Sequence, residues 1–484
     1  MNNLMPRLSL LFFMVCSVAA AQTLSGLDST FADNGVYTHS NELMYKVLIQ
    51  PDGKIITIGW SMSPEEGLVV KRFFQNGTID NSFNTANFSP AQTSTLSLLA
   101  ACMQTDGKIL FGGGGGMIRL QSNGSIDGSF GNAGYVLINS YSGITDLAIQ
   151  ADGKIIAVGV DVDSLANDCV LATRYYADGS IDSTFGNNGR ILHRPGMYGS
   201  YTNKISLLPD GRIDIGLTAY INEIQSQAFA ALRLLPDGEI DTSFNHTGLA
   251  WKQLPGLNYC VAMQLQPDGM ILLAGYADSM ALVRFDSDGA PDNTFGINGV
   301  AKVGEGELHA ILSLQPDGKI LIAPKDDSNF VISRIRSDGS PDMTFGVDGK
   351  IVTKVVQGTN VIHDIMIQAD EKIIAVGGCD DYTEDVFKSV MVRYTADATN
   401  MESLPKHSGN VYVYPNPAGD YVNIQNNTAY DIARIKLFSS SGRLMATYDK
   451  VSRIDLKKIP NGSYWLKLFF KDHNSYSYPI IVTH

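Results

Sequence analysis

Two short motifs recur seven times each before about residue 398, and they constrain the fold more than any other feature of the sequence. The first is an Asp-Gly turn, with Glu371 replacing the glycine in the last copy; its aspartates stand 46 to 58 residues apart, at Asp52, Asp106, Asp152, Asp210, Asp268, Asp317 and Asp370. The second is Asp-x-x-Phe, which begins at Asp28, Asp80, Asp127, Asp182, Asp241, Asp292 and Asp342. Two motifs that recur in phase indicate a repeat architecture in which each copy is one supersecondary unit.

Each repeat contains four short segments rich in β-branched and aromatic residues. In the third repeat these are residues 135–139, 144–150, 154–160 and 169–176, each bounded by Gly, Asp or Asn. The Asp-Gly turn joins the second and third segments, because Gly readily takes the positive φ that a tight hairpin needs. Side chains three and five positions before the turn aspartate are apolar in every repeat. This period of two predicts a strand that packs against a neighbouring sheet.

Seven units of four strands predict an all-β fold, with a seven-bladed β-propeller over residues 22–398. The chain shows a displaced half-repeat at each end: no strand precedes Asp28, and no Asp-x-x-Phe follows the strand at 388–394. We therefore expect the strand near residues 36–39 to complete the last blade, whose other strands lie within 361–394. The alternative is an open array, which would need polar capping repeats that the sequence lacks.

The repeat units resemble a known family. Gln-Pro-Asp-Gly-Lys-Ile-Ile at residues 50–56 and Gly-Ser-Ile-Asp-Ser-Thr-Phe-Gly at residues 179–186 are similar to the units of delta-60 repeat proteins, a bacterial β-propeller group. The resemblance covers about residues 24–398. It implies a propeller with a surface or secreted location, and it transfers no catalytic residue.

The first 21 residues predict a secretory signal peptide. Arg7 supplies a positive charge, residues 8–18 form an apolar run, and Ala19, Ala20 and Ala21 provide the small side chains of a cleavage site. No later apolar stretch reaches the ~18 residues of a membrane span, so we expect the exported chain not to cross a membrane.

The exported chain keeps four cysteines, Cys102, Cys169, Cys260 and Cys379. Their spacing contains no Cys-x-x-Cys pair, so neither a zinc site nor a redox pair is indicated. Because they fall in different repeats, we expect all four to be buried free thiols.

The C-terminal residues depart from the repeat. Residues 399–409 are predicted to form a linker. Residues 410–484 contain short segments in which apolar and polar side chains alternate, and these segments predict a small β-sandwich of about seven strands. The segment resembles the type A C-terminal sorting domain of type IX secretion, and the residues that carry the resemblance are Tyr414, Pro415, Asn416, Pro417, Gly442 and Gly462. The resemblance implies a Bacteroidota-type source, Sec export, recognition by the type IX machinery, and a secreted or outer-membrane surface location.

Two sets of charged residues recur with the repeat. The Asp-x-x-Phe aspartates could form a ring of cation ligands, but seven copies favour a structural role, in which each carboxylate binds backbone N–H groups of its own turn and the Phe fills the gap between blades. Six positions before the turn aspartates, Lys46 and Asp364 would lie on adjacent blades of a closed ring, as would Asp146 and Lys204. We expect two inter-blade ion pairs there, either structural or in contact with a ligand.

Polar side chains gather where the inner strands begin. Aromatic rings with polar tips around a concave mouth suit a sugar or peptide ligand. The candidate ligand-binding residues are Tyr141, Tyr201, Tyr259, His309, His363, Asp146 and Asp364. Acidic loops such as Asp161-x-Asp163 and Asp380-Asp381 could hold Ca²⁺, but they lack the spacing of a dedicated loop, and solvated acidic surface is the favoured interpretation.

Composition and motifs narrow the function. Acidic residues number 49 and basic residues 36, a formal net charge of −13 that argues against nucleic-acid binding. The sequence contains no nucleophile motif, metalloprotease motif or phosphate loop, so we expect no cofactor and no metal. The favoured function is a non-catalytic binding or scaffold module for extracellular glycan or protein. The alternative is a glycan-active hydrolase or lyase, which would need two carboxylates about 5–9.5 Å apart in a pocket.

Overall fold

The computed structural model describes residues 26–484 except for several short segments: 63–65, 85–87, 89–97, 139–142, 166, 197–200, 305–309, 327, 357, 382–383, 385, 397–410, 415–417, 427–430, 440–443, 450 and 472–474. The expected signal peptide (residues 1–21) and linker (residues 399–409) therefore lie outside the described residues.

Up to residue 394 the described residues form seven antiparallel sheets, which we number as blades in chain order. Blade 1 contains β2 (Glu42–Ile49), β3 (Ile55–Ser61) and β4 (Gly67–Phe73). Blade 2 contains β5 (Leu98–Met103), β6 (Ile109–Gly113), β7 (Gly116–Leu120) and β8 (Tyr135–Leu137). Blade 3 contains β9 (Ile144–Ile149), β10 (Ile155–Val162), β11 (Asp168–Tyr175) and β12 (Arg190–His193). Blade 4 contains β13 (Tyr201–Leu207), β14 (Ile213–Ile221), β15 (Ser226–Leu234) and β16 (Leu249–Lys252), with the short 3-10 helix η1 (Phe244–His246) before β16.

The remaining three blades follow the same order. Blade 5 contains β17 (Tyr259–Leu265), β18 (Ile271–Tyr276), β19 (Met280–Phe285) and β20 (Val300–Gly304). Blade 6 contains β21 (Ala310–Leu314), β22 (Ile320–Pro324), β23 (Phe330–Ile335) and β24 (Lys350–Thr353). Blade 7 contains β25 (Gly358–Ile367), β26 (Ile373–Asp381) and β27 (Val386–Tyr394), and its fourth strand is β1 (Val36–Ser40).

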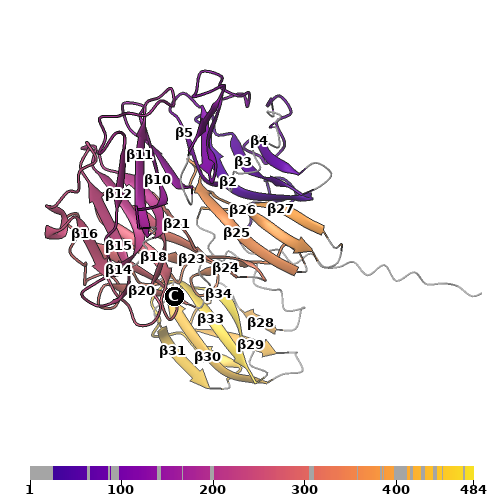
Figure 1. Cartoon of the computed structure of the whole chain (residues 1–484). Coiled ribbons are helices and arrows are strands. Elements are labelled where there is room, and N and C mark those ends of the chain that lie inside the picture. The colour runs from indigo at the N-terminus through magenta and orange to yellow at the C-terminus, as the bar shows by residue number, and fades with distance from the viewer. Residues whose placement is uncertain are drawn as a thin grey trace, which may run out of the picture.

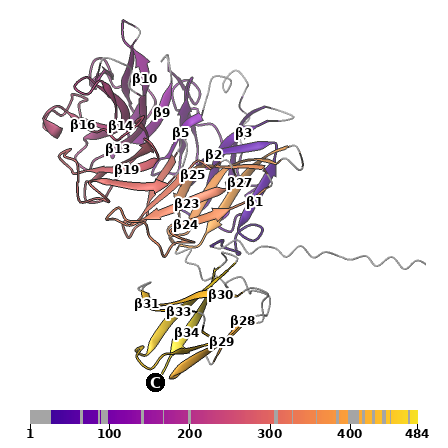
Figure 2. The same ribbon diagram turned by 90° about the horizontal axis from the view of Figure 1, so that it is seen from below.

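The N-terminal strand closes the ring. β1 pairs antiparallel with β27, with Val36 opposite Val392 and Ser40 opposite Lys388. Figure 1 shows the indigo strands β2–β4 next to the orange strands β25–β27, and Figure 2 shows β1 beside β27. The expected circular closure is therefore confirmed, and an open array is excluded. Because the outer strand of each blade precedes the inner strand of the next, blades and sequence repeats are offset by one strand.

The inner strands surround the propeller axis. β2, β5, β9, β13, β17, β21 and β25 each contact the next inner strand, and β25 contacts β2. Apolar side chains of the second and third strands fill the space between neighbouring sheets, and many of them are completely buried. The ring therefore places position-equivalent residues of different blades around one central cavity.

Most inner strands carry a β-bulge near their midpoint. The strand register shifts between Met44 and Lys46 in β2, and between Ile362 and Asp364 in β25. A glycine faces several of these bulges: a Cβ atom on Gly59 would lie 1.8 Å from the Leu43 carbonyl oxygen. Because bulges redirect side chains and often occur next to functional sites, this feature sets which residues face the axis.

The C-terminal residues form two further sheets. One contains β28 (Val411–Tyr414), β29 (Tyr421–Asn426) and β32 (Arg453–Asp455), and the other contains β30 (Ile432–Ser439), β31 (Leu444–Asp449), β33 (Gly462–Phe470) and β34 (Ser475–Val482). Buried side chains from both sheets form one apolar core, including Val422, Ile435 and Leu466. The seven described strands agree with the expected β-sandwich.

The four cysteines are free thiols, as expected, although Cys102 is only partly buried. Burial raises the pKa of the Cys260 thiol to about 12, so the reactive thiolate is disfavoured there. The described part of the chain contains no helix that is long and apolar enough to cross a membrane.

Candidate ligand site in the axial cavity

The Asp-x-x-Phe motifs have the structural role that their sevenfold recurrence predicts. In each motif the aspartate Oδ1 accepts hydrogen bonds from both the N–H and the hydroxyl of the Ser or Thr two residues later, as in Asp182 with Thr184. The Phe is buried and faces the next blade: a Cβ on Gly238, in the turn after β15, would lie 2.9 Å from the ring of Phe185. No group of three or more His, Cys, Asp or Glu side chains arranged for a metal ion occurs among the described residues.

An arginine completes each motif. It lies on the third strand of the blade, eight residues before the motif aspartate, and in blade 7 the aspartate comes from the N-terminus instead. Each guanidinium stacks 4.1–4.9 Å from the motif Phe and donates a hydrogen bond to a backbone carbonyl of the next blade. The seven residues are Arg72, Arg119, Arg174, Arg233, Arg284, Arg334 and Arg393. We call each Arg, Asp and Phe set an inter-blade clamp.

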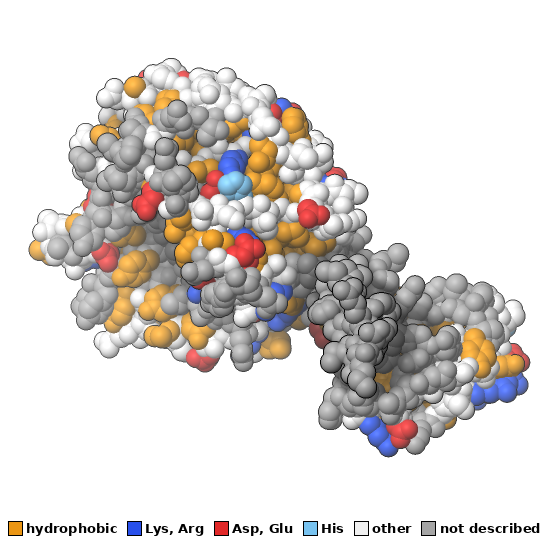
Figure 3. All heavy atoms as spheres, turned by 90° about the vertical axis from the view of Figure 1, so that its right-hand side faces the viewer, with side chains coloured by type: hydrophobic (Ala, Val, Ile, Leu, Met, Phe, Trp, Pro, Cys, Tyr) orange, Lys and Arg blue, Asp and Glu red, His pale blue; other side chains and the backbone are white. Residues whose placement is uncertain are grey.

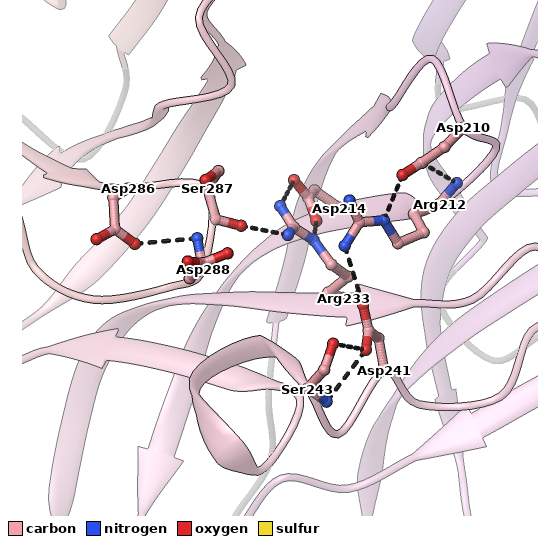
Figure 4. Close-up of polar contacts among 9 residues, drawn as sticks. All are labelled: Asp210, Arg212, Asp214, Arg233, Asp241, Ser243, Asp286, Ser287 and Asp288. Carbon is pink, nitrogen blue, oxygen red and sulfur yellow. Dashed lines mark hydrogen bonds and ion pairs between the residues drawn. The ribbon is translucent and has the colours of Figure 1, made fainter.

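In six blades the arginine pairs with the motif aspartate, at 2.8 Å for Arg174 and Asp182. Blade 4 differs, as Figure 4 shows: Arg233 turns to Asp214 on β14, with contacts of 2.6 and 2.8 Å, and Arg212 reaches Asp241 at 3.4 Å. The turn of this blade carries Arg212 where most other repeats carry lysine. Turn lysines also approach the motif aspartate in other blades, at 3.3 Å for Lys54 and Asp80, without displacing the arginine. Blade 4 differs because β14 carries Asp214 where the second strands of the other blades carry Ile or Leu. Asp214 is completely buried, and Arg233 neutralises it while Arg212 contacts the motif aspartate.

The clamps predict how stability depends on pH. Burial raises the pKa of Asp182, but hydrogen bonds from the hydroxyl and N–H of Thr184 outweigh burial and lower the pKa to about 2. The pKa of Asp28 falls to about 2 for the same reasons, with Thr30 as the donor. A carboxyl whose pKa is lowered on folding adds stability above its unfolded pKa of ~4, and this stability is lost as the pH falls through the folded pKa.

We therefore expect the free energy of unfolding to stay level as the pH falls from 7 to about 4, and then to drop between about 4 and 2. Urea titrations followed by circular dichroism across this range measure the effect. In the Asp182→Asn variant the difference from the wild type should be largest at pH 7 and should shrink below pH 4. A difference that is independent of pH would contradict this assignment.

The axial cavity is the candidate functional site. It has a volume of about 390 Å³ and is lined by inner-strand residues of blades 1, 3, 4, 5, 6 and 7. One part of its wall is polar and includes Lys46, Asp146, Lys204, His363 and Asp364. The other part is mainly apolar and comes from blades 5 and 6; it contains Val261, Ala262, Met263, Ala310, Ile311 and Leu312.

Asp146 and Asp364 each link their blade to the next one through a hydrogen bond from a backbone N–H. Asp146 Oδ2 accepts the N–H of Ile205 on the next blade at 3.1 Å. Asp364 Oδ2 accepts the equivalent N–H, that of Val47, at 3.0 Å, across the seam between blades 7 and 1. Each aspartate therefore lies beside the lysine of the next blade, as the sequence predicts for a closed ring.

The expected ion pairs form in only one of the two places. Lys204 Nζ lies 3.5 Å from Asp146 Oδ1. Lys46 and Asp364 share the cavity without an ion pair within 4 Å, and the remaining Asp364 oxygen accepts the N–H of Ile365 at 3.1 Å. The expectation of two ion pairs was thus correct for Asp146 and Lys204 and wrong for Lys46 and Asp364.

His363 occupies the bulge of β25. Its Nδ1 lies 2.7 Å from the Met44 carbonyl oxygen, so Nδ1 carries the proton and donates it, and its ring lies 5.0 Å from the ring of Tyr45. Burial lowers the pKa of His363 below its usual value, and the Lys46 ammonium adds to this effect. The imidazole is therefore neutral at physiological pH and presents Nε2 as a hydrogen-bond acceptor.

The other candidate residues lie elsewhere. Tyr201 and Tyr259 stand at the starts of β13 and β17; Tyr201 is 47% exposed, and neither residue lines the axial cavity. Tyr141 and His309 fall outside the described residues, as do Pro415, Asn416, Pro417 and Gly442 of the sorting motif. Tyr414 ends β28 and Gly462 begins β33. The structure thus brings together Asp146, His363 and Asp364.

Three of the four aspartates in these acidic loops, Asp161, Asp163 and Asp381, pair with basic side chains. Asp161 pairs with Arg190 at 2.6 Å, and Asp381 pairs with Lys388 at 2.9 Å. Figure 3 shows one side of the molecule, where charged side chains stand as small separate groups among apolar and uncharged atoms. This arrangement favours ordinary polar surface over a calcium loop.

Two family models match the chain. The model described as a domain of unknown function (DUF5122) β-propeller matches six segments, residues 50–83, 104–130, 150–185, 208–244, 266–295 and 315–345. The secretion system C-terminal sorting domain matches residues 412–483. The chain carries DUF5122 β-propeller repeats and ends in a secretion sorting domain. Each matched propeller segment runs from the Asp-Gly turn to the motif Phe, and the seventh copy is divided between the two ends of the propeller sequence.

The sorting domain indicates export through the type IX system to the cell surface or the medium. Among solved structures, the chain is similar to PorZ, an essential surface component of the type IX secretion system of Porphyromonas gingivalis, with 11% identity and a TM-score of 0.38 over 91% of this chain. The match spans 59% of the length of PorZ.

Two further solved structures cover less of the chain. A protein from Lactobacillus plantarum is 13% identical with a TM-score of 0.43, and the match covers 74% of this chain and 96% of that protein. The polysaccharide lyase Uly1 is 11% identical with a TM-score of 0.46, and the match covers 77% of this chain and 93% of the lyase. None of the curated proteins compared with the chain matches it.

Proposed function

We propose that this DUF5122 propeller is an exported, non-catalytic binding module that takes an extracellular glycan or protein segment at its axial cavity. The observation that carries the proposal is the division of the cavity wall into a polar and an apolar part. Small-molecule sites are typically concave and largely apolar, with a few placed polar groups that fix the orientation of the ligand. The clamps join neighbouring blades around the cavity, which suits a site that must exist before its ligand arrives.

The hydrolase or lyase alternative is disfavoured by how the cavity carboxylates are used. Among the described residues, Asp146 and Asp364 are the acidic ones that line the cavity, and each of their four oxygens already faces an N–H or ammonium donor. A general acid or base must be within hydrogen-bond reach of the proton that it transfers to or from the substrate. Proton transfer at either carboxylate would therefore compete with the hydrogen bond that links it to the next blade.

The proposal is tested with the purified full-length chain and a panel of soluble oligosaccharides and peptides. We expect at least one class of probe to raise the melting temperature, with no new reducing ends or cleaved peptides after prolonged incubation. Ile311→Trp, which places a bulky ring in the cavity, should abolish the shift. The control, Leu137→Trp, adds the same ring at a position that is 84% exposed on the outer strand β8, and it should not affect binding. Turnover of a probe would favour the enzyme, and binding that survives Ile311→Trp would exclude this cavity.

A further inference from the structure

Lys46 is a charged side chain that the protein places in the axial cavity without a close partner. It lines the cavity from the middle of β2, and among the described residues no hydrogen bond or ion pair within 4 Å involves its ammonium group. The equivalent lysine of blade 4, Lys204, pairs with Asp146 at 3.5 Å. The two lysines therefore differ in their surroundings although they occupy the same repeat position.

The aspartate on the preceding blade also has different partners at the two sites. In Asp146 one oxygen binds the next blade and the other is left for the lysine. In Asp364 one oxygen binds the next blade and the other binds the N–H of Ile365. Each Asp364 oxygen thus accepts a backbone N–H, and neither oxygen lies within 4 Å of the Lys46 ammonium group.

An ammonium group without a partner is energetically unfavourable in a partly buried position of the axial cavity. Burial lowers the pKa of Lys46, and repulsion from Lys204 lowers it further, whereas Asp364 and Asp146 act in the opposite direction. Lys46 is partly buried, and an ion that loses part of its hydration is stabilised by a counter-charge and hydrogen-bond acceptors, which the described cavity wall does not supply within 4 Å. A bound anion would supply both.

We propose that the axial cavity binds a small organic carboxylate, whose oxygens pair with the Lys46 ammonium. The inference rests on the proposed binding function and names the chemical class of its ligand. Formal charges on the polar wall cancel, since two lysines face two aspartates, so a monoanion adds one negative charge where a dianion such as phosphate would add two.

The rest of the cavity suits the body of such a ligand. His363 Nε2 is an acceptor for a ligand hydroxyl or amide N–H, because Nδ1 donates to Met44. The apolar wall formed by Val261, Met263 and Ile311 faces the carbon skeleton. The carboxylate could belong to an acidic sugar or to a peptide C-terminus, and both present one carboxylate on a compact organic body.

The test measures binding of matched probes to the full-length chain by calorimetry. D-glucuronate and D-glucose represent an acidic sugar and its neutral counterpart, and N-acetylalanine and N-acetylalaninamide do the same for a peptide end. Inorganic sulfate is the dianion control, and sulfate binding as tight as that of the carboxylate probes would contradict the carboxylate assignment. We expect a carboxylate probe to bind and its neutral counterpart to bind at least about tenfold more weakly, the size of one charge-assisted hydrogen bond.

Three variants assign the effect to Lys46. Lys46→Gln should weaken carboxylate binding about tenfold or more, and Lys46→Arg, which keeps the cation, should retain most of it. Lys302→Gln removes an exposed lysine of β20 and should change nothing. Melting curves of all three establish that they fold. Carboxylate binding unaffected by Lys46→Gln would overturn the inference.

The outcome also separates this inference from the proposed function. Binding of the neutral probes as tightly as the acidic ones would overturn the carboxylate assignment and leave a binding module. Failure of every probe, including the wider panel above, would overturn both. The member of the panel that binds more tightly, glucuronate or N-acetylalanine, identifies the source of the carboxylate.

Discussion

Removal of residues 26–40 is expected to prevent the propeller from folding to a stable monomer. The deletion takes away β1, which pairs with β27 along five residues, and it also removes Asp28 and Phe31 of the clamp on Arg393. Phe31 is completely buried, and losing a buried Phe alone costs about 3–5 kcal/mol, against a typical total stability of about 5–15 kcal/mol. The exposed edge of β27 would then present unpaired backbone groups to other chains.

Size-exclusion chromatography and thermal unfolding of the truncated chain measure this loss. We expect aggregation or a broad transition without cooperativity. The matched control is a circular permutant in which residues 26–40 follow residue 396, so that the same strand reaches the same edge from the other end of the chain. The permutant should recover a cooperative transition. A truncated chain that melts like the full chain would show that β1 is dispensable.

Arg233→Met is expected to be the most destabilising single substitution among the clamps. It leaves Asp214, which is fully buried, without the two hydrogen bonds at 2.6 and 2.8 Å that neutralise it. Breaking a buried pair by removing one partner costs about 3–5 kcal/mol, because an uncompensated charge stays in the interior. Replacing both partners with apolar residues is often nearly neutral.

Urea unfolding of three chains separates these effects. Arg233→Met should lower the free energy of unfolding by about 3–5 kcal/mol, and the double variant Arg233→Met/Asp214→Leu should recover most of that loss. Asp214→Leu alone leaves the guanidinium unpaired and should resemble Arg233→Met. If the double variant is as unstable as the sum of the single variants, packing and not charge explains the role of Arg233.

Much of the fold could be predicted from the sequence, because each repeat carries its own turn chemistry. The displaced copy at Asp28 predicted closure, since a motif with no strand before it must complete a blade elsewhere. The structure confirms this where β1 pairs with β27 and where Arg393 at the end of blade 7 pairs with Asp28.

The arginine of each clamp was missed although its signal is strong. An arginine stands eight residues before the motif aspartate in six repeats, as Arg174 does before Asp182, and Arg393 holds the same place in the last blade. The glycine that faces a bulge, such as Gly59, also recurs at a fixed distance from the turn aspartate in several repeats. Both the arginine and the glycine recur at fixed positions of the repeat. They lie outside the two main motifs, so those motifs alone do not predict them.

The ion pairing inside the axial cavity could not be predicted from the spacing of the sequence repeats. Repeat position places Lys46 near Asp364 and Lys204 near Asp146, and the structure agrees. Whether an ion pair forms depends on how the lysine and aspartate side chains are directed at the bulges of β2 and β25. Repeat spacing shows which residues share the cavity, but it does not fix the direction of their side chains.

The account depends on closure of the ring, because Lys46 and Asp364 come together only if blade 7 meets blade 1. The most direct measurement is disulfide formation in the variant His39→Cys/Ser389→Cys, whose positions are directly opposite each other in β1 and β27. Directly opposite residues of antiparallel strands have Cα atoms about 4.5–5.5 Å apart, within the range that a disulfide bridges. Peptide mapping after mild oxidation should find the two peptides linked, whereas the out-of-register variant Val36→Cys/Ser389→Cys should stay reduced. Two thiols that remain free in the in-register variant, or equal linkage in both variants, would contradict a ring closed by the N-terminal strand.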